Sequence, residues 1–424
     1  MKLEISTLRL TSFLMLGFIL FMYSCSNDDN DPVSPAPTTN TVTGKVINEI
    51  GNGIPNTTVF ITGTNDPTTT GADGSFAVSG VTAPYDLNMV SGNFGFQYKG
   101  LSTFSPKLLA IGPASTSNSA TLTVVIPAMT AGQQCRAYFT DGADVHSVST
   151  PIVFPAVSKT FSVSWPSGAS ITGKIIVLIY TVSGTIISHY DKYGELANYT
   201  VNNGGVQTQT FTSSEINVVP GNAIVTGSIS VPANYTVSGS ALLIKFGNAG
   251  SPFSGSDLYQ IAGNTYSYNV PTGLTTVPVI SVQGVGTGPN NIQTFKAGTV
   301  TVPSTGNVII LESAATLSSP PNGETNINFN TNFTFSQGSG TGVNIVSFTG
   351  QGKTFYVFTT ASNVKLPDLS NLGLGISAST VYNWRLIKFC TFTGVDQFVS
   401  SGLFFNTGFV SESYSEIRSF TTAP

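Results

Sequence analysis

The chain has 424 residues, which corresponds to about three or four domains of typical size. Only 8% of the residues are charged, 16 basic against 20 acidic, so a basic surface that binds nucleic acid is not expected. Glycine (44) and proline (23) are frequent, yet 40% of the chain is hydrophobic and 11% is aromatic. This composition predicts a folded, turn-rich protein rather than a disordered one.

The chain begins with the pattern of a secretory signal. Lys2 and Arg9 precede a mostly apolar run from Leu10 to Tyr23, and Ser24 and Cys25 follow. The run has about 14 residues, whereas a membrane-spanning helix needs about 20. A cleaved signal is therefore favoured over the alternative, an uncleaved membrane anchor.

The residues Met22-Tyr-Ser-Cys25 resemble the signal of bacterial lipoproteins, in which the new N-terminal cysteine is acylated. The Ser-Asn-Asp-Asp run that follows is similar to the tract after the lipidated cysteine in surface lipoproteins of the Bacteroidetes group. The resemblance implies a signal peptide at 1–24, a lipid on Cys25 and a flexible tether at 25–41. It also implies that the membrane is a partner through the lipid, and that the protein lies at the outer membrane or the cell surface.

From residue 42 onward the pattern predicts an all-β protein. Apolar and polar residues alternate in short runs such as 42–46 and 225–231, and Gly, Pro, Asn and Asp clusters separate these runs. Weakly similar segments begin near residues 76, 161 and 266, a spacing typical of tandem β-sandwiches. We therefore predict four β-sandwich modules, at 42–127, 128–221, 222–314 and 315–424.

The first module resembles the carboxypeptidase regulatory-like domain, a transthyretin-like sandwich of seven strands. The matching segments are Val42-Thr-Gly-Lys-Val46, Gly53-Ile-Pro55 and Thr70-Gly-Ala-Asp-Gly-Ser-Phe76. Gly71 stands where the family usually has aspartate. The resemblance implies a hairpin turn at Asp73-Gly74 that places the ring of Phe76 in the core.

The last module resembles the fibronectin type III and immunoglobulin-like sandwiches of bacterial surface proteins. The matching segments are 320–323, 332–335, 382–386 and 418–422. Strand periodicity places Tyr382, Trp384 and Leu386 on one face and Asn383 and Arg385 on the other. We expect the first set to face the core, with Tyr382 in the position of a tyrosine corner.

Residues for catalysis or metal binding are scarce. The chain has two histidines, His146 and His189. Asp144 and His146 would share a face of a strand and could bind a metal with a third ligand, although a hairpin turn explains the same residues. No hydrolase, zinc-protease, phosphate-loop or calcium-loop motif occurs, so we expect no enzyme and no cofactor. Cys135 and Cys390 predict no disulfide framework and suit buried apolar positions.

Segment 189–199 is the best candidate for binding. It contains Tyr190, Tyr193 and Tyr199 together with Asp, Lys and Glu. Tyrosine rings beside polar groups are suited to sugar rings, through stacking and hydrogen bonds. The alternative is a solvated hairpin between core strands. Weaker candidates, which also suit a core, are Trp165, Tyr259, Tyr266 and Tyr268.

Two functions of different classes follow. The first is a non-enzymatic surface lipoprotein that serves as a structural or adhesive β scaffold, with a surface glycan or protein as its partner. The second is an outer-membrane glycan-binding lipoprotein, similar to the polysaccharide-capture proteins of the Bacteroidetes group. A glycosidase is a third hypothesis. It is disfavoured because the Asp and Glu residues are dispersed in turns rather than paired.

Overall fold

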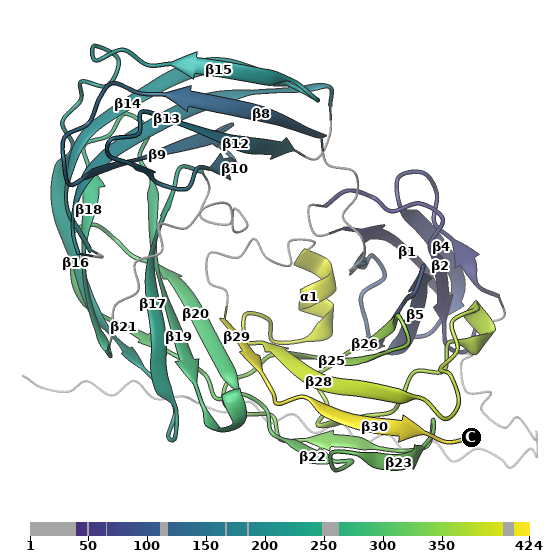
Figure 1. Cartoon of the computed structure of the whole chain (residues 1–424). Helices are drawn as coiled ribbons and strands as arrows, with labels where there is room; N and C mark the ends of the chain where they lie inside the picture. The colour runs from purple at the N-terminus through teal and green to yellow at the C-terminus, as the bar shows by residue number, and fades with distance from the viewer. Residues whose placement is uncertain are drawn as a thin grey trace, which may run out of the picture. The chain divides into compact units, whose positions relative to one another are not determined.

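Strands form nearly all of the regular structure (Figure 1). The computed structural model describes residues 40–48, 51–64, 66–110, 118–165, 168–184, 186–247, 263–401 and 411–424. The predicted signal peptide, Cys25 and nearly all of the tether lie outside these residues. One short α-helix and two 3-10 turns accompany the strands in the described part, so the all-β prediction is confirmed.

The first predicted module contains eight strands. They are β1 (Asn40–Ile47), β2 (Thr58–Ile61), β3 (Thr68–Thr69), β4 (Ser75–Val81), β5 (Tyr85–Ser91), β6 (Phe94–Leu101), β7 (Lys107–Leu109) and β8 (Asn118–Val125). Phe76 on β4 is buried, as predicted. Its ring packs on Gly44 of β1, where an added Cβ would lie 2.5 Å from the ring. Strand β1 therefore has a glycine at the position where the ring of Phe76 lies against it.

The second predicted module contains seven strands. They are β9 (Gln133–Thr140), β10 (Val145–Val148), β11 (Ile152–Val153), β12 (Ser158–Trp165), β13 (Ser170–Ser183), β14 (Ile186–Asn202) and β15 (Val206–Thr210). Strand β8 pairs with β12 and β15, although it precedes the predicted boundary at 127. The long strands β13 and β14 pair along their whole length, with β-bulges that shift the register.

The third predicted module contains six strands and a 3-10 turn. They are β16 (Gly221–Ser230), β17 (Thr236–Lys245), β18 (Thr265–Thr272), β19 (Val279–Thr287), η1 (Pro289–Asn291), β20 (Gln293–Thr299) and β21 (Ser304–Ile310). The alternating run 225–231 falls largely in β16, where Val225 and Ile229 are buried. Strand β16 pairs with β18 on one side and β21 on the other.

The last predicted module contains the remaining elements. They are β22 (Leu317–Ser319), β23 (Glu324–Ile327), β24 (Phe333–Phe335), β25 (Val343–Gly350), β26 (Lys353–Thr359), β27 (Asn363–Val364), η2 (Ser370–Leu372), β28 (Val381–Phe389), α1 (Val395–Ser401), β29 (Ser411–Tyr414) and β30 (Arg418–Thr422). The predicted faces of β28 are confirmed, because Tyr382, Trp384 and Leu386 are fully buried. The hydroxyl of Tyr382 accepts a hydrogen bond from Ser377 N (3.2 Å), the bond expected of a tyrosine corner.

One sheet crosses the predicted module boundaries. Its strands follow the order β17-β19-β20-β29-β28-β25-β26-β6-β5-β2-β3, with β23 and β30 joined at the side. Strand β26 pairs in parallel with β6 of the first module, and β20 of the third module pairs antiparallel with β29 of the last. Figure 1 shows this band of strands running from β17 through β28 toward β5. The module boundaries themselves remain predictions.

Two of the hydrophobic cores also join predicted modules. Buried residues of the first module share a core with Val343, Phe358 and the helix residues Phe398 and Val399. A second core combines β9, β13 and β14 with the strands of the third module. Residues 39–424 therefore form one unit. Among the described residues, no helix has both the length and the apolar character to cross a lipid bilayer.

Candidate functional site

The candidate site lies on the face of the large sheet opposite the core that contains Trp384. Adjacent strands bring its residues into register: Tyr356 of β26 lies opposite Ser347 of β25, and Ser347 lies opposite Arg385 of β28. One strand further, Tyr414 of β29 lies opposite Ile387. Because alternate residues of a strand point to the same face, these side chains share one surface.

A cavity of about 440 Å³ opens on this face, within the roughly 300–1,000 Å³ of small-ligand sites. It is lined by Leu109, Ile345, Ser347, Thr349, Tyr356, Asn383, Trp384, Arg385, Ile387, Phe389, Phe398, Glu412, Tyr414 and Ile417. The lining is mainly apolar and aromatic, with few charged groups. We call Tyr356, Ser347, Arg385, Glu412 and Tyr414 the sheet-face site.

Tyr414 connects the two charged residues of the site. The guanidinium carbon of Arg385 lies 5.7 Å from the centroid of the Tyr414 ring, a cation–π distance. The hydroxyl of Tyr414 donates to Glu412 Oε2 (2.6 Å), and its ring also stacks on Phe295 of β20 at 6.2 Å. These contacts hold the ring in place beneath Arg385.

Tyr356 forms the opposite aromatic wall. Its ring stacks on Phe96 of β6 at 5.5 Å, across the parallel pair that joins β26 to β6. Tyr356, Arg385 and Tyr414 are all half-buried, so each keeps part of its side chain accessible. Ser347, the small residue between Tyr356 and Arg385, leaves space between the two larger side chains. The site can therefore hold a flat or ring-shaped group between aromatic walls, beside hydrogen-bond donors.

Glu412 is the buried acid of the site, with 4% of its surface exposed. Burial raises the pKa of its carboxyl, and the hydrogen bond from Tyr414 opposes that rise. Burial, and next the charge of Glu412, raises the pKa of the Tyr414 phenol. The Tyr414 hydroxyl therefore keeps its proton and acts as a donor to Glu412.

We expect Glu412→Gln to change the pH dependence of stability. The raised pKa means that between pH 4.5 and the folded-state value the native protein binds more protons than the unfolded chain. The contribution of Glu412 is complete below pH 4.5 and is lost as the pH rises through the folded-state pKa. The stability of the wild type should thus fall relative to that of the Glu412→Gln variant by up to about 1.4 kcal/mol per pH unit in that window. Urea denaturation at several pH values tests this, and parallel pH profiles would contradict it.

The tyrosines predicted from segment 189–199 have different surroundings. Tyr190 and Tyr193 are 1% and 0% exposed and belong to the core shared by the second and third modules. In this position their rings have no free face for a sugar. Tyr199 is half-buried and packs against the core of the second module. The structure does not bring the three rings to one surface.

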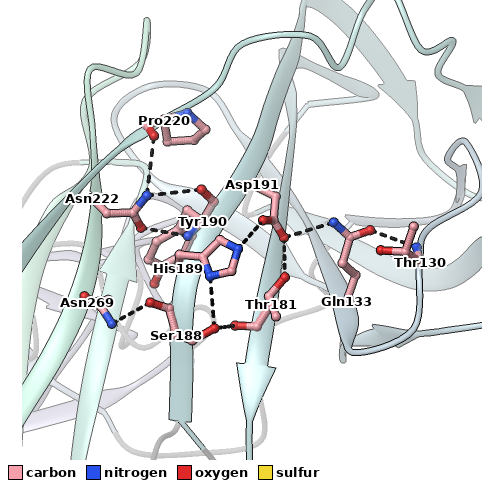
Figure 2. Close-up of polar contacts among 10 residues, drawn as sticks. All are labelled: Thr130, Gln133, Thr181, Ser188, His189, Tyr190, Asp191, Pro220, Asn222 and Asn269. Carbon is pink, nitrogen blue, oxygen red and sulfur yellow. Dashed lines mark hydrogen bonds and ion pairs between the residues drawn. The ribbon is translucent and has the colours of Figure 1, made fainter.

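Polar side chains around Tyr190 link neighbouring strands (Figure 2). The carboxylate of Asp191 accepts hydrogen bonds from Thr181 Oγ1 (2.7 Å) and Gln133 Nε2 (3.1 Å) and lies 2.7 Å from His189 Nε2. Asn222 of β16 accepts from Tyr190 N (2.7 Å) and donates to Tyr190 O (3.2 Å). This network joins β9, β13, β14 and β16.

Ser188, His189 and Asp191 contain the groups of a serine-hydrolase relay, but the geometry differs. Ser188 Oγ lies 3.1 Å from His189 Nδ1, while its own proton goes to the carbonyl of Thr181 (3.1 Å). A serine nucleophile instead directs its proton to the imidazole. The arrangement therefore supports strand pairing rather than a nucleophile.

The hairpin interpretation of segment 141–146 is confirmed. Asp141 Oδ1 accepts from Ala143 N (2.9 Å) and Asp144 N (2.7 Å), which closes the turn between β9 and β10. The carboxylate that faces His146 is Asp141, 3.0 Å from Nε2, and not Asp144 as the metal hypothesis required. Within the described ranges, no three His, Cys, Asp or Glu side chains cluster to hold a metal ion.

The other residues singled out in the sequence lie in cores. Trp165, Tyr266 and Tyr268 are nearly fully buried, and Tyr259 lies outside the described residues. Cys135 is buried and Cys390 is partly buried, both as free thiols. Burial raises the pKa of both thiols, which keeps them protonated.

Sequence reasoning predicted the outward face of Arg385 but missed Tyr356, Glu412 and Tyr414. Tyr356 lies in the apolar run Phe355-Tyr-Val-Phe358, in which the other three residues are buried in cores on both faces of β26, so alternation did not mark it as a site residue. Nothing in the sequence says that β26, β25, β28 and β29 are neighbours in this order. That order is what assembles the site.

Comparisons with known proteins identify no family. The chain matches no protein-family model and no curated protein. Among solved structures it is similar to the Bacillus anthracis TIE protein (6% identity, 64% of this chain and 50% of that chain, TM-score 0.17). It is also similar to a Ca2+-stabilized adhesin with which an Antarctic bacterium binds ice (10% identity, 82% and 94%, TM-score 0.13).

A third similar structure is SGBP-B of the Bacteroides ovatus mixed-linkage glucan utilization locus, in complex with a mixed-linkage heptasaccharide. Its identity is 9%, it covers 93% of this chain and 100% of that chain, and the TM-score is 0.13. The chain spans half the length of the TIE protein. All three likenesses are distant.

Proposed function

We propose that this protein is a non-enzymatic, lipid-anchored surface protein that binds a glycan at the sheet-face site. The observation that carries the proposal is the cavity of about 440 Å³ between Tyr356 and Tyr414, with Arg385 beside them. Sugar rings have apolar faces that stack on aromatic side chains and hydroxyl groups that pair with donors such as a guanidinium. The aromatic rings and the guanidinium donor both lie on the same face of one sheet here.

A glycan array probed with the detergent-solubilised full chain tests this function. We expect specific binding that is lost in Tyr356→Ala, because this change removes one aromatic wall of the cavity. Tyr199→Ala is the matched control, since Tyr199 is half-buried on β14 and lies outside the cavity lining. Binding that is lost in Tyr199→Ala but kept in Tyr356→Ala would move the site to segment 189–199.

A second candidate is a structural or adhesive scaffold, as predicted from the sequence. The continuous sheet and the shared cores favour it, because they make residues 39–424 one unit. Such a body would present a surface at a fixed orientation without needing a ligand cavity. No binding to any glycan on the array, together with adhesion of protein-coated beads to cells, would favour this candidate.

Both candidates include a lipid on Cys25, and the lipoprotein-like signal supports it. We expect Cys25→Ala to shift the protein from the membrane fraction to the soluble fraction, because no acyl chain would then be attached. Labelled palmitate should enter the wild-type chain only. Equal labelling of the variant, or its retention in washed membranes, would contradict the anchor.

A further inference from the structure

Within the described ranges, the guanidinium of Arg385 forms no ion pair and donates no hydrogen bond to the protein. In the part of the chain that the structure describes, it stacks on the ring of Tyr414. Arg418, by contrast, donates to the carbonyls of Leu317, Ser318 and Pro320 and pairs with Glu416. A guanidinium has five N–H donors, and stacking on a ring leaves those on its edge free.

The fork of a guanidinium matches a carboxylate. Two parallel N–H groups bind both oxygens of a carboxylate at once, which gives direction as well as affinity. Cation–π stacking on Tyr414 restricts Arg385 before a ligand arrives, so less side-chain entropy is lost on binding. A cation that no described carboxylate pairs with, in a mainly apolar cavity, therefore favours an anionic ligand.

The other charged group that lines the cavity is Glu412, and its carboxylate accepts a hydrogen bond from the same Tyr414 on which Arg385 stacks. Glu412 pairs across the strands with Phe389, four residues along β28 from Arg385. Its carboxylate is bound by the Tyr414 hydroxyl, and no ion pair joins it to Arg385 among the described residues. Burial raises the pKa of Glu412, and the hydrogen bond from Tyr414 opposes that rise.

The rest of the cavity suits a saturated ring. Tyr356 and Arg385 are two strand spacings apart, about 10 Å, and Ser347 lies between them. A pyranose ring placed over Ser347 would stack against Tyr356 and direct a ring substituent to Arg385. Asn383 and Thr349, both exposed, line the open end and offer further donors and acceptors to a neighbouring sugar.

We infer that the sheet-face site binds an acidic glycan, with Arg385 holding the carboxylate of a hexuronate residue and Tyr356 stacking on its ring. The inference rests on the proposed glycan-binding function and adds the class of ligand to it. The ligand is distinguished from a neutral sugar by one group, the carboxylate.

Isothermal titration of the full chain with tetragalacturonate tests the inference. The matched ligand is the fully methyl-esterified tetragalacturonate, which keeps the rings and removes the charges. We expect the acid to bind about ten- to a hundredfold more tightly than the ester. In Arg385→Gln the acid should lose its advantage over the ester, and Tyr356→Ala should weaken both ligands.

The possible failures are distinct. Equal binding of acid and ester to wild type, or an advantage of the acid that survives in Arg385→Gln, would overturn the acidic-glycan inference and leave the proposed glycan binding intact. Binding of neither tetrasaccharide, together with a silent glycan array, would overturn both. Arg385→Lys keeps the charge without the fork and should recover part of the advantage. Circular dichroism of each variant verifies that it is folded.

Discussion

Tyr193→Ala is expected to lower the free energy of unfolding by about 3–5 kcal/mol, the usual cost of removing a buried aromatic ring. Tyr193 is fully buried, and its ring lies 6.5 Å from that of Phe246, a residue of the third predicted module. Its hydroxyl donates to Glu195 (2.5 Å) and accepts from Thr276 N (3.3 Å). The substitution therefore leaves a cavity and unpaired polar groups where the second and third modules share a core.

Urea denaturation of the full chain measures this effect through tryptophan fluorescence, to which the buried Trp165 and Trp384 both contribute. Tyr199→Ala, on the same strand but half-buried, should cost only about 1 kcal/mol. Equal and small effects of the two substitutions would show that Tyr193 is not packed as described. Glycan binding by folded Tyr193→Ala protein should match that of the wild type.

Lys388→Met is expected to lower the free energy of unfolding by about 2–4 kcal/mol. Lys388 is 1% exposed, and its ammonium donates to the carbonyls of Gln337 (2.7 Å), Ser339 (3.1 Å) and Gly340. Hydrogen bonds to a charged group contribute about 1.5–3 kcal/mol each. The variant has no buried ammonium to desolvate on folding, which offsets part of their loss. Methionine fills the same volume but binds none of the three carbonyls.

Lys353→Met is the matched control for that experiment. Among the described residues, the ammonium of Lys353 donates to one carbonyl, that of Gly375 (2.7 Å), and its side chain is half-buried. Loss of this hydrogen bond should lower the free energy of unfolding by about 1 kcal/mol, because water can replace the ammonium as the donor to Gly375. If both substitutions destabilise the protein equally, the three carbonyls do not depend on Lys388.

Local alternation predicted much of the fold. It assigned the two faces of β28, and the resemblance to the carboxypeptidase regulatory-like domain implied the core position of Phe76. These predictions succeed because a single strand fixes which side chains share a face. What a strand does not encode is which other strand lies beside it, so the pairing of β26 with β6 had no signal in the sequence.

The tyrosines of β14 show why periodicity did not predict the burial of the first candidate binding residues. Tyr190 and Tyr193 are an odd number of residues apart, yet both are buried. A β-bulge explains this: Tyr190 lies opposite Tyr180 and Lys192 opposite Ile179, so Asp191 is the extra residue. The sheet is also covered on this face by the third module, which alternation within one strand cannot indicate.

The sheet-face site could not be predicted either, because the sequence does not show which strands are neighbours in the sheet. The outward position of Arg385 followed from periodicity, and Tyr356 and Tyr414 were brought beside it by three strand pairings. Taken alone, each of these two tyrosines could equally belong to a core or to an ordinary surface. Only the order of the strands makes them two walls of one cavity.

Hydrogen exchange of the full chain with and without tetragalacturonate tests the location of binding most directly. The sheet-face site predicts slower exchange of backbone amides in 353–358, 383–387 and 411–415, the strand segments that carry Tyr356, Arg385 and Tyr414. Exchange in 189–199 should be unchanged. Protection confined to 189–199, or saturated binding without protection in the three sheet-face segments, would contradict the account.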